Sequence, residues 1–370
     1  MNILSSEVIF PFALGIGYFF FFVLKELKLN RFFSELLKTS QPVSGTIPIS
    51  VVIACKNEEK NISDLLSAIE SIEYPKDKCE FIIVDDGSTD RTLELLTKFA
   101  SENKNIKVIK AGNKVFPAKK GALHAGIQNA LFDSIMITDA DCAPQKNWLI
   151  SAEYSFLKGN GVVFGIAPYK DEVGFIHQFF CYEQFAASTH YLSAALAGYP
   201  YSAAARNFGF TKAVYDELGG YSGTLESVGG DDDLFLLQAV NRNKSVGVIP
   251  CLDQSFPVST APQDWDAYFA QRSRHVKTSD HYRTGTQTWL AVFHSVHFLS
   301  LISVFFCGIS STFVLPLLLK LAGDTRLAHK YAVRFNYNFG IFRTLSFIFL
   351  YELTIPVNFF NSIFRKDKWK

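Results

Sequence analysis

Residues 49–58 read Ile-Ser-Val-Val-Ile-Ala-Cys-Lys-Asn-Glu, a short apolar run rich in β-branched side chains that ends in polar residues. This composition and length predict a buried β-strand followed by a loop. The next segment, 61–72, places Ile62, Leu65, Leu66 and Ile69 at helical spacing. A strand followed directly by a helix is the repeating unit of an α/β fold.

The same alternation continues to residue 139. Further strands are expected at 81–84, 106–109 and 134–138, and further helices at 89–100 and 119–130. Strands that alternate with helices imply a mostly parallel sheet, Rossmann-like in type, with helices on both faces. The fold class expected is therefore α/β.

Polar residues follow three of the expected strands, at 55–58, 85–87 and 139–141. Ligands of open parallel sheets bind beyond the carboxyl ends of the strands. We therefore expect these three clusters to converge on one edge of the sheet and to form a site.

The chemistry of that site is indicated most directly by Asp139 and Asp141, which one residue separates. In an extended turn both carboxylates can reach one hard cation, and carboxylates favour Mg²⁺ or Mn²⁺ shared with substrate phosphates. Such a cation would neutralise a leaving diphosphate. The alternative is a solvated turn or a helix cap, but the position at the end of an apolar strand favours a function.

Other polar residues at this edge suit a nucleotide. Asp85, Asp86 and Glu58 could accept hydrogen bonds from a base or a ribose, although a turn with a helix cap is the simpler explanation. Lys119 and Lys120 open an expected helix, where cations oppose the helix dipole and therefore suggest a phosphate partner. A solvated lysine pair is the alternative.

A second acidic cluster, Asp231-Asp-Asp233, lies about ninety residues after Asp141. Adjacent carboxylates repel one another, which raises the pKa of one member and suits it to act as a general base. The alternative is an acidic helix start stabilised by the helix dipole. Further along, Gln271 and Arg274 share one helix face, and an arginine fork suits diphosphate. This segment also fits a basic interfacial helix.

Three apolar segments indicate contact with lipid. Residues 8–24 carry no charge and precede Lys25, Lys28 and Arg31, which predicts an uncleaved anchor with the following domain in the cytoplasm. Residues 289–319 also lack charged side chains and suit a hairpin of two short helices, after which the basic stretch 326–334 returns to the cytoplasm.

The third apolar segment, 339–360, is interrupted by Arg343, Glu352 and Pro356. It could span the membrane, re-enter it or lie in its interface. The basic run 365–368 after it favours a cytoplasmic end.

The composition agrees with a membrane protein. Hydrophobic residues make up 48% of the 370 residues and include 36 Phe, whereas the net charge is only +1. No basic run is long enough to indicate nucleic acid. The six cysteines form no CxxC pair, so we expect free thiols in a reducing compartment.

Taken in order, these motifs resemble family 2 glycosyltransferases with a GT-A fold, in particular the membrane-bound bacterial branch related to polysaccharide synthases. The motifs that carry the resemblance lie at 50–59, 85–90, 119–123, 139–141, 206–210 with 219–221, 231–233 and 271–275. They cover about two-thirds of the chain.

The resemblance implies an architecture and a location. It implies an N-terminal transmembrane anchor at 1–30, a cytoplasmic GT-A catalytic domain at 47–285, and a C-terminal membrane region at 289–370 with a hairpin at 289–322 and a further helix at 339–362. The protein would be integral to the bacterial inner membrane. It would move a sugar from a nucleotide-sugar donor to a lipid-linked or glycan acceptor and invert the anomeric carbon.

The resemblance also implies residue roles. The donor would be held by Glu58, Asp85, Asp86, Lys120, Asp139, Gln271 and Arg274. Asp141, together with Asp139, would bind the Mg²⁺ or Mn²⁺ cofactor. The acceptor side would include Arg206, Asn207 and His275.

Two departures from the family pattern matter. Three Asp replace the family's Glu-Asp pair, so the general base is Asp231 or Asp232, while Asp233 fits a helix start. His275 replaces the Trp of the family's QxxRW motif and offers less area for stacking on a sugar. Single-sugar transfer is therefore favoured at least as much as processive synthesis.

Two other functions are alternatives to sugar transfer. One is a catalytically silent membrane subunit of a polysaccharide synthase complex, and the other is a different phosphoryl or nucleotidyl transfer on a related sheet. The complete set of acidic and basic motifs argues against a silent subunit. The lack of a Gly-rich phosphate loop argues against a P-loop transferase.

Overall fold

The structure is a computed structural model that describes residues 6–38, 45–227 and 229–365. The chain divides into two compact units. The sheet unit comprises 33–170 and 194–261, and the helical unit comprises 1–32, 171–193 and 262–366. Each unit is described separately below.

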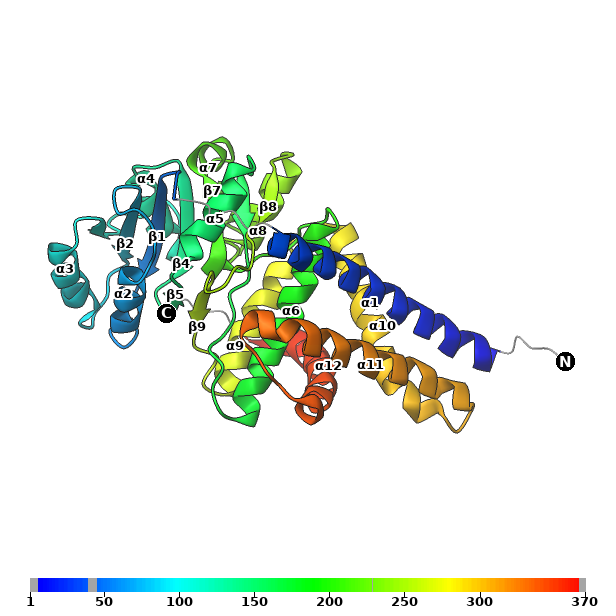
Figure 1. The fold of residues 1–370 in the computed structure, drawn as a ribbon. Helices are drawn as coiled ribbons and strands as arrows, with labels where there is room; N and C mark the ends of the chain where they lie inside the picture. Colours follow the sequence, from blue (N-terminus) through cyan, green and yellow to red (C-terminus); the bar gives the residue numbers. More distant parts are fainter. Residues whose placement is uncertain (1–5, 39–44, 228, 366–370) are drawn as a thin grey trace. The chain divides into compact units, whose positions relative to one another are not determined.

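The sheet unit contains nine described strands (Figure 1). They are β1 (Ile49–Cys55), β2 (Cys79–Asp85), β3 (Ile106–Lys110), β4 (Ser134–Asp139), β5 (Cys142–Pro144), β6 (Val162–Phe164), β7 (Phe208–Thr211), β8 (Val246–Val248) and β9 (Pro257–Ser259). Seven of them form one sheet in the order β3-β2-β1-β4-β7-β6-β8. Only β7 runs antiparallel to its neighbours. The remaining two, β5 and β9, pair antiparallel.

Helices cover both faces of this sheet. The helices of the unit are α2 (Ile62–Glu70), α3 (Thr92–Glu102), α4 (Ala118–Gln128), α5 (Trp148–Leu157), α7 (Lys212–Glu217) and α8 (Asp233–Asn241). Val51 and Ile53 share a buried cluster with α2 and α5. Val52 faces the other way, where it lies so close to Gly126 of α4 that a Cβ there would stand 2.4 Å from it.

These observations confirm the α/β fold class and the mostly parallel sheet. The four strands expected from the sequence occur as β1 to β4, with ends within two residues of the prediction. Central strands buried on both faces have a continuous apolar sequence, and β2 is buried at all seven positions.

The helical unit contains six helices among its described residues. They are α1 (Ser6–Lys38), α6 (Phe175–Leu196), α9 (Trp265–Ser279), α10 (Thr284–Ile302), α11 (Val314–Tyr331) and α12 (Ile341–Phe364). Three helical segments are long and apolar enough to cross a membrane, namely Glu7–Ser34, Thr284–Phe306 and Ile341–Phe364. The expected hairpin corresponds to α10 and α11, which short 3₁₀ turns at Ser303–Phe306 and Ser311–Phe313 connect.

The division into units differs from the domain expected at 47–285. Residues 171–193 and 262–285 belong to the helical unit, so α6 and α9 pack with the apolar helices. In α6, Phe179 contacts Phe347 of α12, and in α9, Tyr268 accepts a hydrogen bond from Asn358 of α12 at 3.2 Å. The residues after Arg365 in the terminal basic run lie outside the described part of the chain.

Candidate active site

The strand register brings the three polar clusters to one edge of the sheet. Cys55 at the end of β1 is the partner of Asp85 at the end of β2, and Ala54 is the partner of Asp139 at the end of β4. The backbone N–H of Asp86 donates to the carbonyl of Cys55 at 2.8 Å, which ties the first two strand ends together. The expected convergence therefore follows from parallel pairing of adjacent strands.

The buried thiol of Cys55 reports the electrostatics of this edge. Burial raises the pKa of Cys55, and nearby carboxylates raise it further. Those carboxylates belong to Glu58, Asp85, Asp139 and Asp141. Four acidic side chains gathered around one buried position create a strongly negative site, which favours a cation or a set of donor groups.

The residues expected to hold the nucleoside are ordered by local contacts. Glu58 is buried, and its carboxylate accepts from the Asn61 side chain at 2.6 Å. Asp85 accepts from the backbone N–H of Ser88 at 3.3 Å. Asp86 is ion-paired with Lys114 at 2.8 Å, so a ligand would meet a paired rather than a bare carboxylate there.

Lys119 is the centre of the site. Its Nζ lies 2.6 Å from Oδ1 of Asp139 and 2.9 Å from Oδ2 of Asp231. Burial alone would lower the pKa of Lys119, but the two carboxylates outweigh burial and raise it above its ordinary value. A charged, nearly buried lysine therefore joins the end of β4 to the second acidic cluster.

Lys120, the lysine that the sequence prediction assigned to the donor, has other contacts. Its Nζ donates to the carbonyl of Thr224 and, at 2.9 Å, to that of Ser227. The side chain is 1% exposed, and burial lowers its pKa. The structure thus gives Lys120 a role in holding the loop before Asp231 and leaves Lys119 to face the acidic residues.

The second acidic cluster separates into three different environments. Both carboxylate oxygens of Asp232 accept backbone N–H groups, from Asp233 at 2.7 Å and from Ala205 at 2.8 Å. Burial raises the pKa of Asp232, and its two Asp neighbours raise it further. Asp233, the first residue of α8, accepts from Ala203 N–H at 2.7 Å. Asp231 is the member that pairs with a lysine side chain.

Arg206 and Asn207, two of the three residues expected on the acceptor side, differ from each other. Arg206 stacks over the ring of Tyr169 at 4.8 Å and donates to Ser259. The pKa of Arg206 is raised because Tyr169, Cys142, Asp141 and Asp139 together outweigh the effect of burial. Arg206 therefore belongs to the same charged region as the strand-end carboxylates.

Asn207 is 1% exposed and packs in the core. Its amide accepts from Trp148 Nε1 at 2.9 Å and donates to the carbonyl of Ile166 at 2.7 Å. Because both ends of the amide are used internally, the structure gives Asn207 a structural role and does not support the expected contact with an acceptor.

Gln271, Arg274 and His275 lie on α9, in the helical unit. Arg274 and His275 are exposed, whereas the intervening Arg272 is buried and ion-paired with Glu183 of α6. The segment thus presents its motif residues on the surface of the helical unit and anchors itself through Arg272. Sequence reasoning missed this anchoring role, and the presence of two arginines in the segment, Arg272 and Arg274, was the signal for it.

A divalent cation would find suitable ligands at the strand edge. Asp139 and Asp141 offer hard carboxylate oxygens, and Mg²⁺ is commonly held by one or two carboxylates together with substrate phosphates. Within the described residues, the grouping of three or more side chains that meets a metal-ligand criterion lies elsewhere, at His297, Asp324 and Glu352. There Lys320 already contacts all three side chains, so its ammonium takes the place of a metal.

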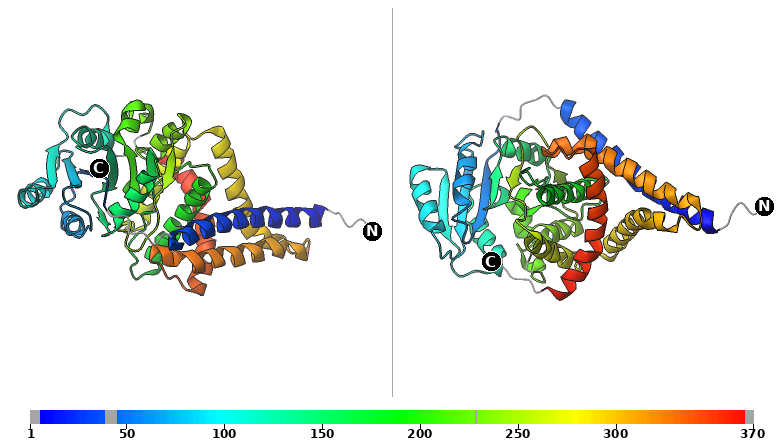
Figure 2. Two further views of the ribbon diagram at one scale, coloured as in Figure 1. Left: turned by 45° about the horizontal axis from the view of Figure 1, so that its top comes forward. Right: turned by 90° about the horizontal axis from the view of Figure 1, so that it is seen from below.

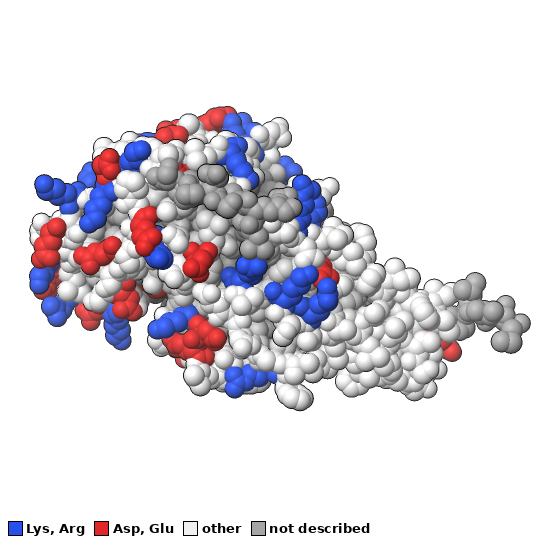
Figure 3. All heavy atoms as spheres, viewed as in Figure 1, with Lys and Arg blue, Asp and Glu red and all other residues white. Residues whose placement is uncertain are grey.

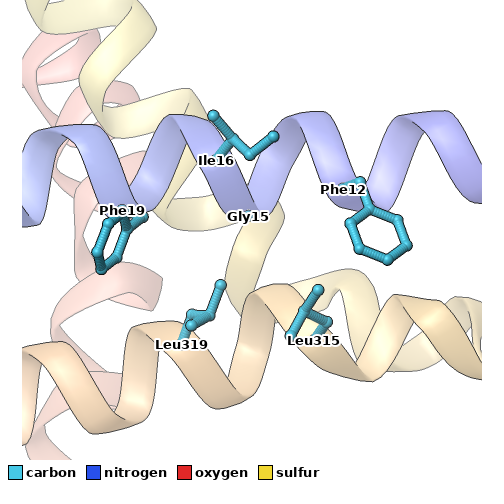
Figure 4. Close-up of a pocket in the computed structure, with 6 residues that line it drawn as sticks. All are labelled: Phe12, Gly15, Ile16, Phe19, Leu315 and Leu319. Carbon is cyan, nitrogen blue, oxygen red and sulfur yellow. The ribbon is translucent and has the colours of Figure 1, made fainter.

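An apolar groove of about 220 Å³ lies between α1 and α11 and is not part of this site (Figure 4). Its lining residues are Phe12, Gly15, Ile16, Phe19, Leu315 and Leu319. No polar side chain lines it, so it suits hydrocarbon and not a nucleotide.

Comparison with known proteins adds three findings. Residues 50–219 match the family model described as glycosyl transferase family 2. The poly-β-1,6-N-acetyl-D-glucosamine synthase of Staphylococcus epidermidis is 35% identical over 146 residues, which are 38% of this chain and 33% of that protein. The probable glycosyltransferase YdaM of Bacillus subtilis is 25% identical over 235 residues, 61% of this chain and 54% of that protein.

Among solved structures, the mannosyltransferase PcManGT from Pyrobaculum calidifontis, in complex with GDP-Man and Mn²⁺, has a TM-score of 0.60. The alignment covers 98% of this chain and 99% of that one at 15% identity, so it establishes a shared fold. The chain spans about a third to a half of the length of the two curated relatives named above.

Proposed function

We propose that this chain, whose residues 50–219 match the glycosyl transferase family 2 model, is an inverting glycosyltransferase that uses a nucleotide-sugar donor. Its acceptor is a lipid-linked molecule or a glycan at the cytoplasmic face of the bacterial inner membrane. The relative named as a poly-N-acetylglucosamine synthase and the fold neighbour in complex with GDP-Man support sugar transfer as the reaction class.

One observation carries the proposal: Lys119 connects Asp139, at the donor end of the sheet, to Asp231. The link places a general-base candidate beside the residues that would face a sugar diphosphate. In addition, Asp232 and Asp233 use their carboxylates to hold backbone N–H groups. Of the two base candidates that the sequence left open, Asp231 is therefore the better one.

The reaction then follows from the positions of these groups. The Asp231 carboxylate accepts the proton of the acceptor hydroxyl as its oxygen attacks the anomeric carbon. The bond to the diphosphate breaks on the opposite side of that carbon, so the configuration is inverted. Glu58, Asp85 and Asp86 hold the nucleoside, and Lys119 is placed to compensate diphosphate charge.

Mg²⁺ or Mn²⁺ fits the same edge. Asp141, with Asp139, would hold the cation, which when bound supplies positive charge for the leaving diphosphate. Lys119 contacts Asp139 directly, so its ammonium must share that carboxylate with any cation that binds there. The donor is therefore expected to bind together with the cation, because its phosphates add oxygen ligands.

The proposed acceptor is bound at the membrane. The apolar segments Glu7–Ser34 and Thr284–Phe306 would embed the helical unit, and the basic residues in the C-terminal half of α1 favour a cytoplasmic catalytic unit. Gln271 and Arg274 would hold the diphosphate or the acceptor end. His275 in place of an aromatic stacking residue favours transfer of a single sugar.

The proposal is tested with the full chain in detergent or nanodiscs. The purified protein is incubated with a panel of nucleotide-sugars and Mn²⁺ or Mg²⁺, and release of the nucleoside diphosphate is measured with and without bacterial lipid extract. We expect release from one donor, loss of release in Asp231→Asn, and a product of inverted configuration by NMR. A wild-type chain that binds nucleotide-sugars but never turns them over would instead indicate a silent subunit of a synthase.

A further inference from the structure

Helices α1 and α11 pair side by side and run in the same direction. At one end, Thr312, just before α11, donates to the carbonyl of Glu7 at 3.2 Å. At the other end, Tyr331 donates to the side chain of Asn30 at 2.7 Å. The tip of the α10–α11 hairpin therefore reaches the level at which α1 begins.

This pairing bears on which helices cross a bilayer. Residues 6–24 of α1 extend about 28 Å at the α-helical rise of about 1.5 Å per residue, close to the ~30 Å of a hydrocarbon core. Because the hairpin extends equally far along α1, α10 and α11 cross whatever layer α1 crosses. Figure 3 shows almost no charged side chains on the visible surface of this part of the unit.

Helix α11 contains charged residues, which are costly at membrane depth unless they are paired. Lys320 is 0% exposed, and its ammonium lies 3.0 Å from His297, 2.7 Å from Asp324 and 2.7 Å from Glu352. Tyr18 of α1 donates to Asp324 at 2.9 Å. Each charge thus faces an opposite charge or a hydrogen-bonding group inside the helical unit, which is how ionisable groups are tolerated at membrane depth.

Glu352 belongs to α12, so the same cluster fixes the middle of α12 against α11. Figure 2 shows α12 crossing α1 and α11 at a steep angle instead of lying along them. If α1, α10 and α11 cross the bilayer, α12 must run close to the plane of the membrane.

The outward face of α12 is apolar, unlike that of a water-soluble helix, and its buried face combines Phe347 and Ile348 with polar residues. A stripe of large apolar side chains is exposed along its whole length, formed by Phe342, Phe349, Leu353, Val357, Phe360 and Phe364. The buried face carries polar residues, among them Thr344, Glu352, Thr354 and Asn358. A continuous exposed apolar stripe of this kind requires a nonpolar partner.

Basic residues lie at both ends of this helix. Arg343 donates to Gln178 of α6, and Arg365 is ion-paired with Asp266 of α9 at 3.0 Å. Both α6 and α9 pack on α12 in the helical unit. A helix with cations at each end and protein along one face fits the headgroup boundary of a leaflet better than a bilayer crossing.

We propose that α12 lies in the membrane interface with its apolar stripe in the lipid acyl region, and that α1, α10 and α11 are the membrane-spanning helices. The assignment of α12 to the cytoplasmic leaflet rests on the membrane orientation given under the proposed function. Arg326 and Lys330 of α11 pair with Glu26 of α1 at 2.8 and 3.0 Å. In the proposed orientation these residues lie at the cytoplasmic end of the helix bundle.

The first test measures which side of the membrane each end of α12 faces. Cysteines are introduced as Asn338→Cys and Lys368→Cys, intact cells are treated with a membrane-impermeant maleimide, and labelling at each position is read by mass spectrometry. Native Cys307, in the hairpin connection, serves as the marker of the opposite face. We expect Cys307 to be labelled from outside and both introduced cysteines only after permeabilisation. Outside labelling at 368 but not at 338 would show that α12 spans the membrane and would overturn the proposal.

The second test separates an interfacial helix from one that re-enters the bilayer. Spin labels are attached at Phe342→Cys, Leu353→Cys and Phe364→Cys in nanodiscs, with Cys251 and Cys307 changed to Ser, and immersion depth is measured from oxygen and nickel accessibility. Equal, shallow depths at all three positions are expected. A much deeper label at Leu353→Cys would overturn the proposal. Neither test depends on turnover, so failure here is distinct from failure of the glycosyltransferase proposal.

Discussion

The ammonium nitrogen of Lys119 lies 2.9 Å from a carboxylate oxygen of Asp231, so the start of α4 is joined to the acidic turn before α8. The same nitrogen contacts Asp139 at the end of β4. The Lys119 ammonium thus connects three segments that are distant in sequence. A substitution in any one of them should alter the environment of the other two. The predictions below follow from that coupling and from the contrasting contacts of neighbouring residues.

Asp231→Asn should abolish the proton acceptor while leaving the fold intact. We expect the turnover number to fall by about 10²–10⁴-fold with little change in donor affinity, since general-base catalysis contributes about that much. The measurement is steady-state release of nucleoside diphosphate together with donor binding by calorimetry. Turnover within a factor of about three of wild type would remove Asp231 from the mechanism.

Asp232→Asn is the matched variant, because the Asp232 carboxylate holds the backbone N–H of Asp233 at the start of α8 and that of Ala205. Loss of an N-cap carboxylate costs about 1 kcal/mol of folding stability, so thermal unfolding should shift downward. Turnover per folded molecule should change less than in Asp231→Asn. A larger catalytic loss in Asp232→Asn than in Asp231→Asn would reverse the two roles.

Lys119→Met and Lys120→Met separate two adjacent lysines. Lys119→Met should weaken donor binding and, by freeing Asp139, increase the affinity for Mn²⁺ in the absence of donor. Electron paramagnetic resonance of free Mn²⁺ gives that affinity without any turnover. Lys120→Met should leave Mn²⁺ binding unchanged but destabilise the protein by about 1–3 kcal/mol, because the buried carbonyl of Thr224 and the half-buried carbonyl of Ser227 lose their donor. Equal Mn²⁺ affinity in wild type and Lys119→Met would mean that the lysine does not compete for this carboxylate.

Asp141→Ala tests the second carboxylate of the proposed cation site. With Asp141 removed, we expect Mn²⁺ affinity in the presence of a nucleoside diphosphate to fall by at least about tenfold, which corresponds to about 1.4 kcal/mol. The exposed position of Asp141 means that the fold should be unaffected. Glu59→Ala, at another exposed carboxylate, is a suitable control. Unchanged Mn²⁺ affinity in Asp141→Ala would place the cation elsewhere.

The pH dependence of stability should report Asp232. Its native pKa is raised from an ordinary value of 3.8 by burial and by its Asp neighbours. The native state therefore holds a proton that the unfolded state has already released, and the free energy of unfolding should fall as pH rises from about 3.8 through the native pKa. Denaturant unfolding measured from pH 4 upward should show this slope, and Asp232→Asn should reduce it. The same slope in both proteins would assign the titration to another group.

Much of this arrangement could be predicted from the sequence, for identifiable reasons. Strands β1, β2 and β4 have apolar centres, and their parallel pairing alone places Asp85 and Asp139 on one edge. The sequence could not tell Lys119 from Lys120, because neighbouring residues on a helix point about 100° apart and only the packed structure shows which one faces the acidic residues. Likewise, nothing in the pattern around Asn207 revealed that its amide would be consumed by Trp148 and a backbone carbonyl.

The charges of α11 give a last prediction, because Lys320 of this helix is buried against Glu352 of α12. Lys320→Met should lower stability by about 3–5 kcal/mol, the typical cost of breaking a buried ion pair, because Glu352 and Asp324 then lack their cation. The double variant Lys320→Met with Glu352→Gln removes one of the stranded carboxylates and should recover part of that loss. Thermal unfolding of the wild type, of the single variants Lys320→Met and Glu352→Gln, and of the double variant in one detergent gives the coupling free energy of the pair. Additive effects of the two single substitutions would show that Lys320 and Glu352 do not stabilise each other, and that another contact holds α12 across the helix bundle.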